Sequence, residues 1–435
     1  MEVPPTQPGA RDTDKHRIGG WPVVGMLFLF MLINFADRAV LGLAATPIMQ
    51  ELGLSHTQFG LIGASFFTFF SIGALIGGFV VNHVATKWVL AGLALYWTLC
   101  QLPILLPVAA AGLVANRVAL GFGEGPAYPI AVHAAYKWFP SERRALPTSL
   151  IAIGALAGNG IIAPMVVSII AVWSWHTAFG LLGAASLVWC AAWLIFAQEG
   201  PLDAGSRLAR FSGEQEGHVS YRRLLSCRTV IGVLIVGFSA YWLLTLAIVW
   251  LPTLLTQSFG YTAVQAGWMM MLISLCQIII LPTVSTVSDH LKRRGVSSRV
   301  ACGVVACIGT LAAGVIVILL SQSVGSAAIL LCTIAAFSLA NLISVLGPVL
   351  IAEVTPIRQR GAALGIVNAV TTLAGPIAPV ATGLMIDIGA GAGGGGRTAL
   401  LMSGLLVVLS ALAGLVLIDP DNDRIRLSLK QQASS

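Results

Sequence analysis

The stretch Asn116–Pro129, NRVALGFGEGPAYP, lies in the middle of a long apolar run and carries two charged residues. Arg117 and Glu124 are seven residues apart, about two turns of a helix, so their side chains point roughly the same way. A charge at the centre of a bilayer costs about 2.5–3.5 kcal/mol on insertion scales. Both residues are therefore expected to face a protein-lined cavity and are candidate functional residues. A second stretch, NFADR at 34–38, places Asp37 and Arg38 inside the first apolar run.

The composition predicts a protein that crosses the membrane many times. Hydrophobic residues make up 57% of the 435 residues and charged residues only 9%, with a mean hydropathy of +0.90. Soluble globular domains average about 25% charged residues. The seven cysteines stand singly and show no CxxC spacing, so neither a metal site nor a disulfide framework is expected.

Twelve apolar runs are long enough to cross about 30 Å of hydrocarbon. They lie at 21–44, 58–81, 87–107, 110–135, 145–170, 175–197, 229–255, 262–287, 299–320, 326–352, 361–386 and 398–418. We therefore predict an all-α membrane protein with two six-helix halves, 21–197 and 229–418. Residues 1–20 form a disordered cytoplasmic tail, 198–228 a cytoplasmic linker and 419–435 a second cytoplasmic tail.

The basic residues predict the orientation in the membrane. Of the 24 lysines and arginines, 21 fall in segments on one side and only Arg397 on the other. This positive-inside pattern places both termini in the cytoplasm. It also accounts for the net charge of +7, so nucleic-acid binding is not needed to explain that charge.

The two halves resemble each other around their short basic loops. FPSERRALPTSL at 139–150 aligns with TPIRQRGAALGI at 355–366, so that Pro140 matches Pro356 and Arg144 matches Arg360. Parallel six-helix repeats with a binding site at their midplane interface are typical of secondary transporters.

These features resemble the major facilitator superfamily over essentially the whole chain. Within it, NFADR and RVALGFGEGPAYP resemble the anion:cation symporter family of organic-acid, sugar-acid and sialin-like carriers. The resemblance implies that Arg117 binds the carboxylate of an organic anion and that Asp37 and Glu124 couple transport to H⁺. It makes Arg38 either an ion-pair partner of the acids or a second anion contact. Helix geometry allows Asp37, Arg38 and Arg117 to meet at one level of the membrane.

Two departures from the family bear on the substrate. Phe70 stands where hexonate-type members carry a tyrosine, and Ala155 where they carry a glutamine. A site without these polar partners favours an aromatic or short aliphatic carboxylate over a sugar acid, because buried unpaired polar groups are penalised. Further substrate-binding candidates are Phe70 itself, Tyr128, Asn368 and Thr372. Asp387, at the outer end of its helix, is expected to be solvated.

The resulting prediction is a proton-coupled symporter of a small organic anion that works by alternating access and is not an enzyme. It would act as a monomer in a cell inner (plasma) membrane, with H⁺ as coupling ion and no cofactor, metal or catalytic residue. Alternatives stay open. One is an exporter, or a spinster-like carrier of lipids or amphipaths, that runs H⁺ antiport. Another is a static structural ion pair between Asp37 and Arg38.

Overall fold

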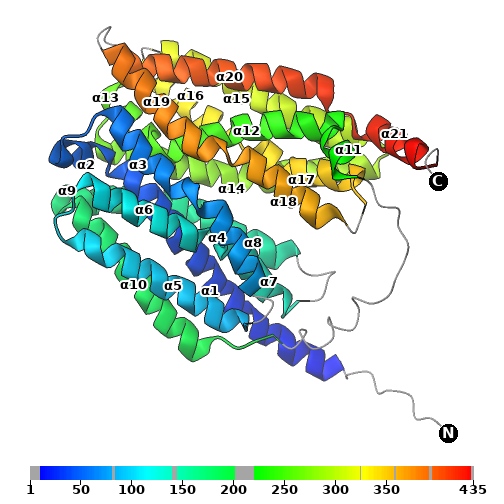
Figure 1. Ribbon diagram of the computed structural model, residues 1–435, viewed down its shortest axis with the longest axis horizontal. Coiled ribbons are helices and arrows are strands. Elements are labelled where there is room, and N and C mark those ends of the chain that lie inside the picture. The colour runs from blue at the N-terminus through cyan, green and yellow to red at the C-terminus, as the bar shows by residue number, and fades with distance from the viewer. Residues whose placement is uncertain are drawn as a thin grey trace. The chain divides into compact units, whose positions relative to one another are not determined.

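Long apolar helices build the described part of the chain, because a backbone inside a bilayer must satisfy its hydrogen bonds within the segment (Figure 1). The computed structural model describes residues 10–80, 84–139, 145–200, 220–323, 325–356, 359–390 and 394–432. The helices of the first half are α1 Ala10–Leu43, α2 Ala45–Leu52, α3 His56–Thr68, α4 Phe70–Val80, α5 Thr86–Gln101, α6 Ala110–Glu124, α7 Ala127–Tyr136, α8 Ala145–Leu156, α9 Ala163–Val172 and α10 Trp175–Phe196.

The remaining helices are α11 Tyr221–Leu225, α12 Arg228–Val249, α13 Leu251–Gln257, α14 Ala263–Arg293, α15 Val305–Gln322, α16 Ser326–Leu339, α17 Leu342–Val354, α18 Arg360–Thr371, α19 Ala374–Ala390, α20 Gly395–Leu417 and α21 Pro420–Gln432. Short 3-10 or π-helical turns occur at η1 Leu102–Leu105, η3 Ala157–Ile161 and η6 Arg299–Val304.

Twelve crossings fit this arrangement. Eleven segments among the described residues are apolar and long enough to span a membrane. The twelfth is the pair α6 and α7, which together cover 110–136 and are separated at Gly125 and Pro126. Each crossing coincides with one predicted run, with ends that differ by seven residues or fewer. The predicted all-α fold with two six-helix halves is therefore confirmed.

The structure can be compared with the three segments that were predicted to lie outside the crossings: the N-terminal tail, the linker and the C-terminal tail. The disordered tail covered residues 1–20, but α1 already begins at Ala10, since no proline follows Pro8 until Pro22. Most of the predicted linker and the matched loop residues Pro140 and Arg144 lie outside the described residues. The C-terminal tail contains α21, whose first turn carries two acidic residues that suit a helix N-terminus.

The chain divides into two compact units that do not follow the sequence halves. Unit 1 comprises residues 1–37, 68–158 and 176–213. Unit 2 comprises residues 38–67, 159–175 and 214–435, so it combines parts of the first half with the whole second half. Within unit 2, α15, α12 and α20 lie side by side (Figure 1).

Glycines explain why parts of the first half pack closely in unit 2. A Cβ atom added at Gly42, Gly60 or Gly160 would overlap a backbone carbonyl oxygen of α12, α19 or α14, respectively. In membranes, helices approach closely where such small residues line the contact. The three contacts join α1, α3 and η3 to helices of the second half.

The outer end of unit 2 carries a hydrogen-bonded cluster that we call the outer latch: His56, Thr57, Gln257 and Asp387. The Asp387 carboxylate accepts hydrogen bonds from the Thr57 amide at 2.8 Å and the Thr57 hydroxyl at 2.6 Å. The His56 amide also donates to it at 3.2 Å, and His56 Nδ1 lies 2.8 Å from the same oxygen. The Asp387 side chain keeps 28% of its surface exposed, so the expectation that it is solvated holds in part. The sequence did not predict that the N-terminus of α3 offers donors to it.

The predicted cytoplasmic end of unit 1 is joined by an ion pair at Glu199. Its carboxylate lies 2.9 Å from Lys137 Nζ and accepts hydrogen bonds from the Thr86 hydroxyl at 2.9 Å and the Lys87 amide at 2.8 Å. Burial opposes the charge, but hydrogen bonds from Lys87, Lys137 and Thr86 outweigh it and hold the pKa of Glu199 below its ordinary value. This cluster connects α5 and the end of α7 to the segment after α10.

Candidate proton and anion site

Asp37 and Arg117 form the centre of a buried polar cluster in unit 1. Asp37, on α1, is fully buried, and Arg117, on α6, is 1% exposed. Arg117 Nη1 donates a hydrogen bond to the backbone carbonyl oxygen of Asp37 at 3.2 Å. This contact confirms the predicted proximity of Asp37 and Arg117. That Arg38 lies at the same level stays a prediction.

The guanidinium of Arg117 is held by protein groups on several sides. Its Nε and Nη2 atoms donate to the side-chain oxygen of Asn116 at 3.0 and 2.9 Å. The Asn116 amide in turn donates to the carbonyl oxygen of Cys100 on α5. The Phe179 ring of α10 covers the guanidinium at 4.9 Å. Arg117 is thus fixed within unit 1 and has almost no accessible surface.

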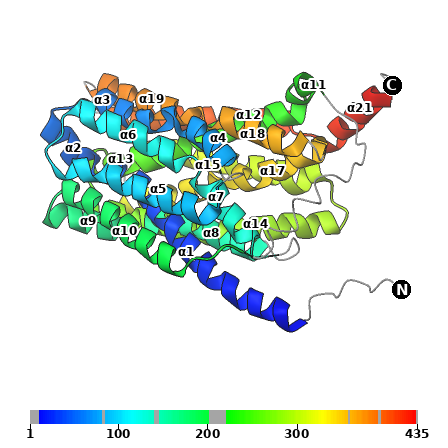
Figure 2. The same ribbon diagram turned by 60° about the horizontal axis from the view of Figure 1, so that its bottom comes forward.

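Glu124 is the last residue of α6 and is fully buried. Both Asp37 and Glu124 interact electrostatically with Arg117 and stabilise its positive charge. Gly125 follows because a Cβ atom there would overlap the carbonyl oxygen of Phe70 on α4. Helices α4 and α6 accordingly lie side by side in unit 1 (Figure 2). The break after Glu124 places a carboxylate among tightly packed helices.

Arg38 follows Asp37 in the sequence but belongs to unit 2. Its guanidinium is half-buried and lies over the Phe66 ring of α3 at 5.5 Å. It also interacts electrostatically with Tyr241 on α12, whose ring lies 6.1 Å from that of Phe67. Arg38 therefore lies near aromatic side chains and, unlike Arg117, keeps part of its surface accessible.

The other predicted substrate residues divide between the units. Phe70 on α4 is half-buried and Tyr128 on α7 is 40% exposed, both in unit 1. Asn368 and Thr372 lie in unit 2, where Asn368 is exposed and Thr372 is 9% exposed. The Thr372 hydroxyl donates to the carbonyl oxygen of Ala369. Substrate binding by these four residues stays a prediction.

Gln101 and Asn116 are members of the cluster that the sequence reasoning did not identify. Gln101 is fully buried, and its Nε2 atom donates to Asp37 Oδ1 at 2.9 Å. A polar side chain inside an apolar helix is itself unusual, so Gln101 carried a usable signal. Asn116 lies beside Arg117 in the quoted stretch, but neighbours in a helix point about 100° apart, so their side-chain contact could not be expected from the sequence.

A model of the Major Facilitator Superfamily matches residues 27–344 and 233–434. The chain belongs to the major facilitator superfamily. It is 27% identical over 408 residues to a probable sulfoacetate transporter of Cupriavidus necator, covering 90% of this chain and 92% of the relative. It is 26% identical over 410 residues to a hexuronate transporter of Bacillus subtilis, covering 92% and 94%.

Solved structures of this superfamily share the fold. A bacterial homologue of the human lysosomal transporter Spinster gives a TM-score of 0.73 at 15% identity, over 94% of this chain and 98% of that one. A D-xylose–proton symporter gives 0.73 at 16% identity, over 93% and 99%. The chain is therefore a multi-pass membrane transporter of the major facilitator superfamily and not an enzyme, and its relatives by sequence are transporters of organic acids. These findings confirm the family resemblance.

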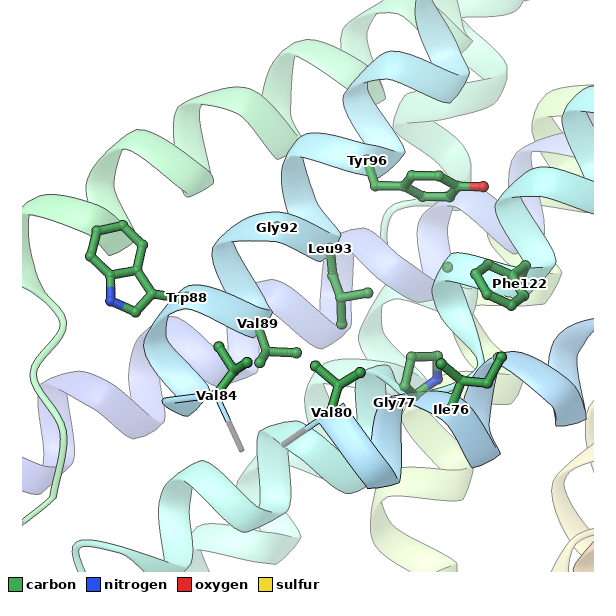
Figure 3. A pocket seen from close by; sticks show the side chains of 13 residues that line it. Ile76, Gly77, Val80, Val84, Trp88, Val89, Gly92, Leu93, Tyr96 and Phe122 are labelled. Atoms are coloured by element: carbon green, nitrogen blue, oxygen red, sulfur yellow. The ribbon is translucent and has the colours of Figure 1, made fainter. Parts of the chain in front are cut away.

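This superfamily member also has an apolar groove in unit 1, between α4, α5 and α6 (Figure 3). Its volume is about 380 Å³, and Val80 and Leu93 point into it from two helices. None of its described lining residues is charged, and its Tyr96 hydroxyl donates to the carbonyl oxygen of Ala119. The groove suits an apolar chain and not a small anion.

Proposed function

We propose that this transporter carries a small organic anion together with protons, and that it prefers an aromatic or short aliphatic carboxylate to a sugar acid. The observation that carries the proposal is the buried Asp37–Arg117 contact, with Glu124 acting on the same arginine. Two acids beside one arginine form a site whose charge changes when a proton binds.

Protonation would change the balance of charge in the cluster. With both acids ionised, one guanidinium faces two carboxylates, and a proton on either acid leaves a neutral set. A neutral set is easier to keep away from water than a charged one. Proton binding would therefore favour the reorientation that alternating access requires.

The burial of Arg117 leaves Arg38 as the more accessible anion contact. A guanidinium offers a planar fork of donors that matches a carboxylate. Phe66, Phe67 and Tyr241 surround or adjoin Arg38 in unit 2 and would favour an aromatic acid. A short aliphatic acid is supported by the sulfoacetate-transporter relative, because sulfoacetate is a two-carbon acid.

The test is uptake into proteoliposomes with an imposed inward proton gradient, using aromatic acids, short aliphatic acids and hexonates. One class of acid should accumulate only with the gradient. Glu124→Gln should still exchange substrate but no longer concentrate it, and Arg38→Ala should raise KM at least tenfold. Arg397→Ala, in the predicted outer loop, is the matched arginine control and should transport normally.

Two results would overturn the proposal. Accumulation that does not depend on the gradient would contradict proton coupling. Wild-type transport by both Arg38→Ala and Arg117→Ala would contradict anion binding at these arginines.

The apolar groove supports a second candidate, a carrier of amphipaths. Transport of a lysophospholipid in the same vesicles, with no acid moving, would make that candidate the better one.

A further inference from the structure

Gln101 ends α5 and is buried next to the proposed proton site. Its Nε2 atom donates to Asp37 Oδ1 at 2.9 Å. Its other polar atom, Oε1, is also buried and has no hydrogen-bond partner among the described residues. A buried amide oxygen without a partner is unfavourable and uncommon, so this position calls for an explanation.

The two atoms of the amide match the two protonation states of a carboxyl group. An ionised carboxylate only accepts hydrogen bonds, whereas a protonated one also has an O–H donor. In the orientation observed, Nε2 donates to Asp37 Oδ1, which suits the ionised form of the acid. After a half-turn of the amide, Oε1 would accept from the O–H group of protonated Asp37. A glutamine can thus bind both forms of the acid, which an apolar residue or a cation cannot do.

The charged and titratable groups around Asp37 do not replace this function. Arg117 donates to the Asp37 backbone carbonyl. Cys100 on α5 and Glu124 on α6 interact electrostatically with Arg117. From α10, the Phe179 ring packs against the Arg117 guanidinium. Arg38, the next residue on α1, belongs to unit 2. Gln101 is a neutral side chain of unit 1 that donates directly to the Asp37 carboxylate.

We infer that Gln101 is a positioning residue that sets the proton affinity of Asp37 by donating to its ionised form and accepting from its protonated form. The inference rests on the proposed function, because it concerns the proton site of that transport. Asp37 exchanges only a proton in this step, and the amide changes its orientation without changing its own protonation.

The test compares Gln101→Met, Gln101→Glu and wild type by gradient-driven uptake across a pH series, together with exchange without a gradient. Gln101→Met removes both the donor to ionised Asp37 and the acceptor for its protonated form. Because the hydrogen bond to the charged form is the stronger of the two, Asp37 should on balance bind its proton about tenfold more tightly. The alkaline limit of uptake should then move up by about one pH unit. Gln101→Glu should move it in the same direction, because two neighbouring carboxyls resist losing both protons.

Thr98→Val is the matched control on α5. Thr98 is 4% exposed and donates to backbone carbonyl oxygens of Ala94 and Gly183, so it is buried and polar but does not contact Asp37. Its alkaline limit should equal that of wild type. Thermal unfolding of each purified variant verifies that it is folded.

The outcomes separate this inference from the proposed function. Wild-type uptake that ignores the proton gradient overturns the proposed function and the role of Gln101 with it. Wild-type uptake that follows the gradient, with an unshifted alkaline limit in both folded Gln101 variants, overturns the inference alone. An equal shift in Thr98→Val also overturns it, because the effect would then be a general result of altering α5.

Discussion

At the scale of single residues, Asn116 orients the Arg117 guanidinium, and its substitution should destabilise the protein. Asn116→Leu removes the oxygen that accepts from Nε and Nη2 of Arg117. Hydrogen bonds to charged groups contribute about 1.5–3 kcal/mol, so the unfolding free energy should fall by about 2 kcal/mol. Asn116→Asp keeps an acceptor and should recover most of this loss. Thermal unfolding in detergent measures both, and a Leu variant as stable as wild type would contradict the role of the contact.

Residue by residue, the sequence predicted the charged part of the cluster and missed its neutral part. Asp37, Arg117 and Glu124 were identified because a charge in an apolar helix is costly enough to require a reason. That Asp37 and Arg117 can lie at one level followed from the rise per residue, and the structure adds a contact between them. The hydrogen bonds of Gln101 and Asn116 depend on which helix faces which, and hydropathy does not contain that information.

At the scale of elements, the contact of α3 with α19 depends on a missing side chain. A Cβ atom at Gly60 would overlap the carbonyl oxygen of Pro379. We expect Gly60→Val to separate the two helices, destabilise unit 2 by about 1–3 kcal/mol and reduce uptake at least tenfold. Gly25→Val is the control, because nothing lies within 4 Å of a Cβ atom at that position. The measurement is uptake per transporter molecule in proteoliposomes. Equal uptake by Gly60→Val and Gly25→Val would show that the close contact is not required.

Glu199 provides a second prediction about elements, because it links α5 to the end of α7. Its folded-state pKa lies below the ordinary value, so its carboxylate stabilises the folded state above that ordinary value, about 4.3. This stabilisation is lost as the pH falls through the folded-state pKa. Glu199→Gln should therefore lower the unfolding temperature at pH 7. The difference from wild type should shrink on acidification, and a difference that stays constant with pH would contradict this.

Helix positions were predictable, and helix ends were less so. Hydropathy reports where a segment leaves the membrane, whereas a helix continues as long as its backbone hydrogen bonds do. Helix α14 was expected to end at 287 but continues to Arg293. Its last turn carries His290, Lys292 and Arg293, which are favourable at a helix C-terminus. The grouping of residues 38–67 with the second half could not be predicted, since it depends on contacts between distant segments.

At the scale of the whole molecule, the alternating access that we propose requires that contacts between the two sequence halves form and break. The outer latch is such a contact, because His56 and Thr57 come from the first half and Asp387 from the second. His56 Nε2 also lies 3.1 Å from the side-chain oxygen of Gln257, at the end of α13. By the positive-inside rule these residues lie at the outer ends of their helices. In the proposed mechanism, closing the outer end would use these hydrogen bonds and opening would have to release them.

Asp387→Ala should consequently favour opening at the outer end. Loss of these hydrogen bonds should destabilise the closed state by about 1.4 kcal/mol. The ratio of open to closed molecules should then rise about tenfold. Thr382 is fully buried five residues before Asp387 on α19, so the reactivity of a cysteine introduced there would report whether this position becomes exposed. Thr382→Cys should react severalfold faster with a membrane-impermeant thiol reagent when Asp387→Ala is present. The labelling of the same chains without the introduced cysteine is subtracted as background.

Asp289→Ala, at the opposite end of the crossings, is the control and should not change the rate. Unchanged labelling in Asp387→Ala would mean that the outer end stays closed without this carboxylate, and that helix packing at Gly42, Gly60 and Gly160 supplies the closing energy instead.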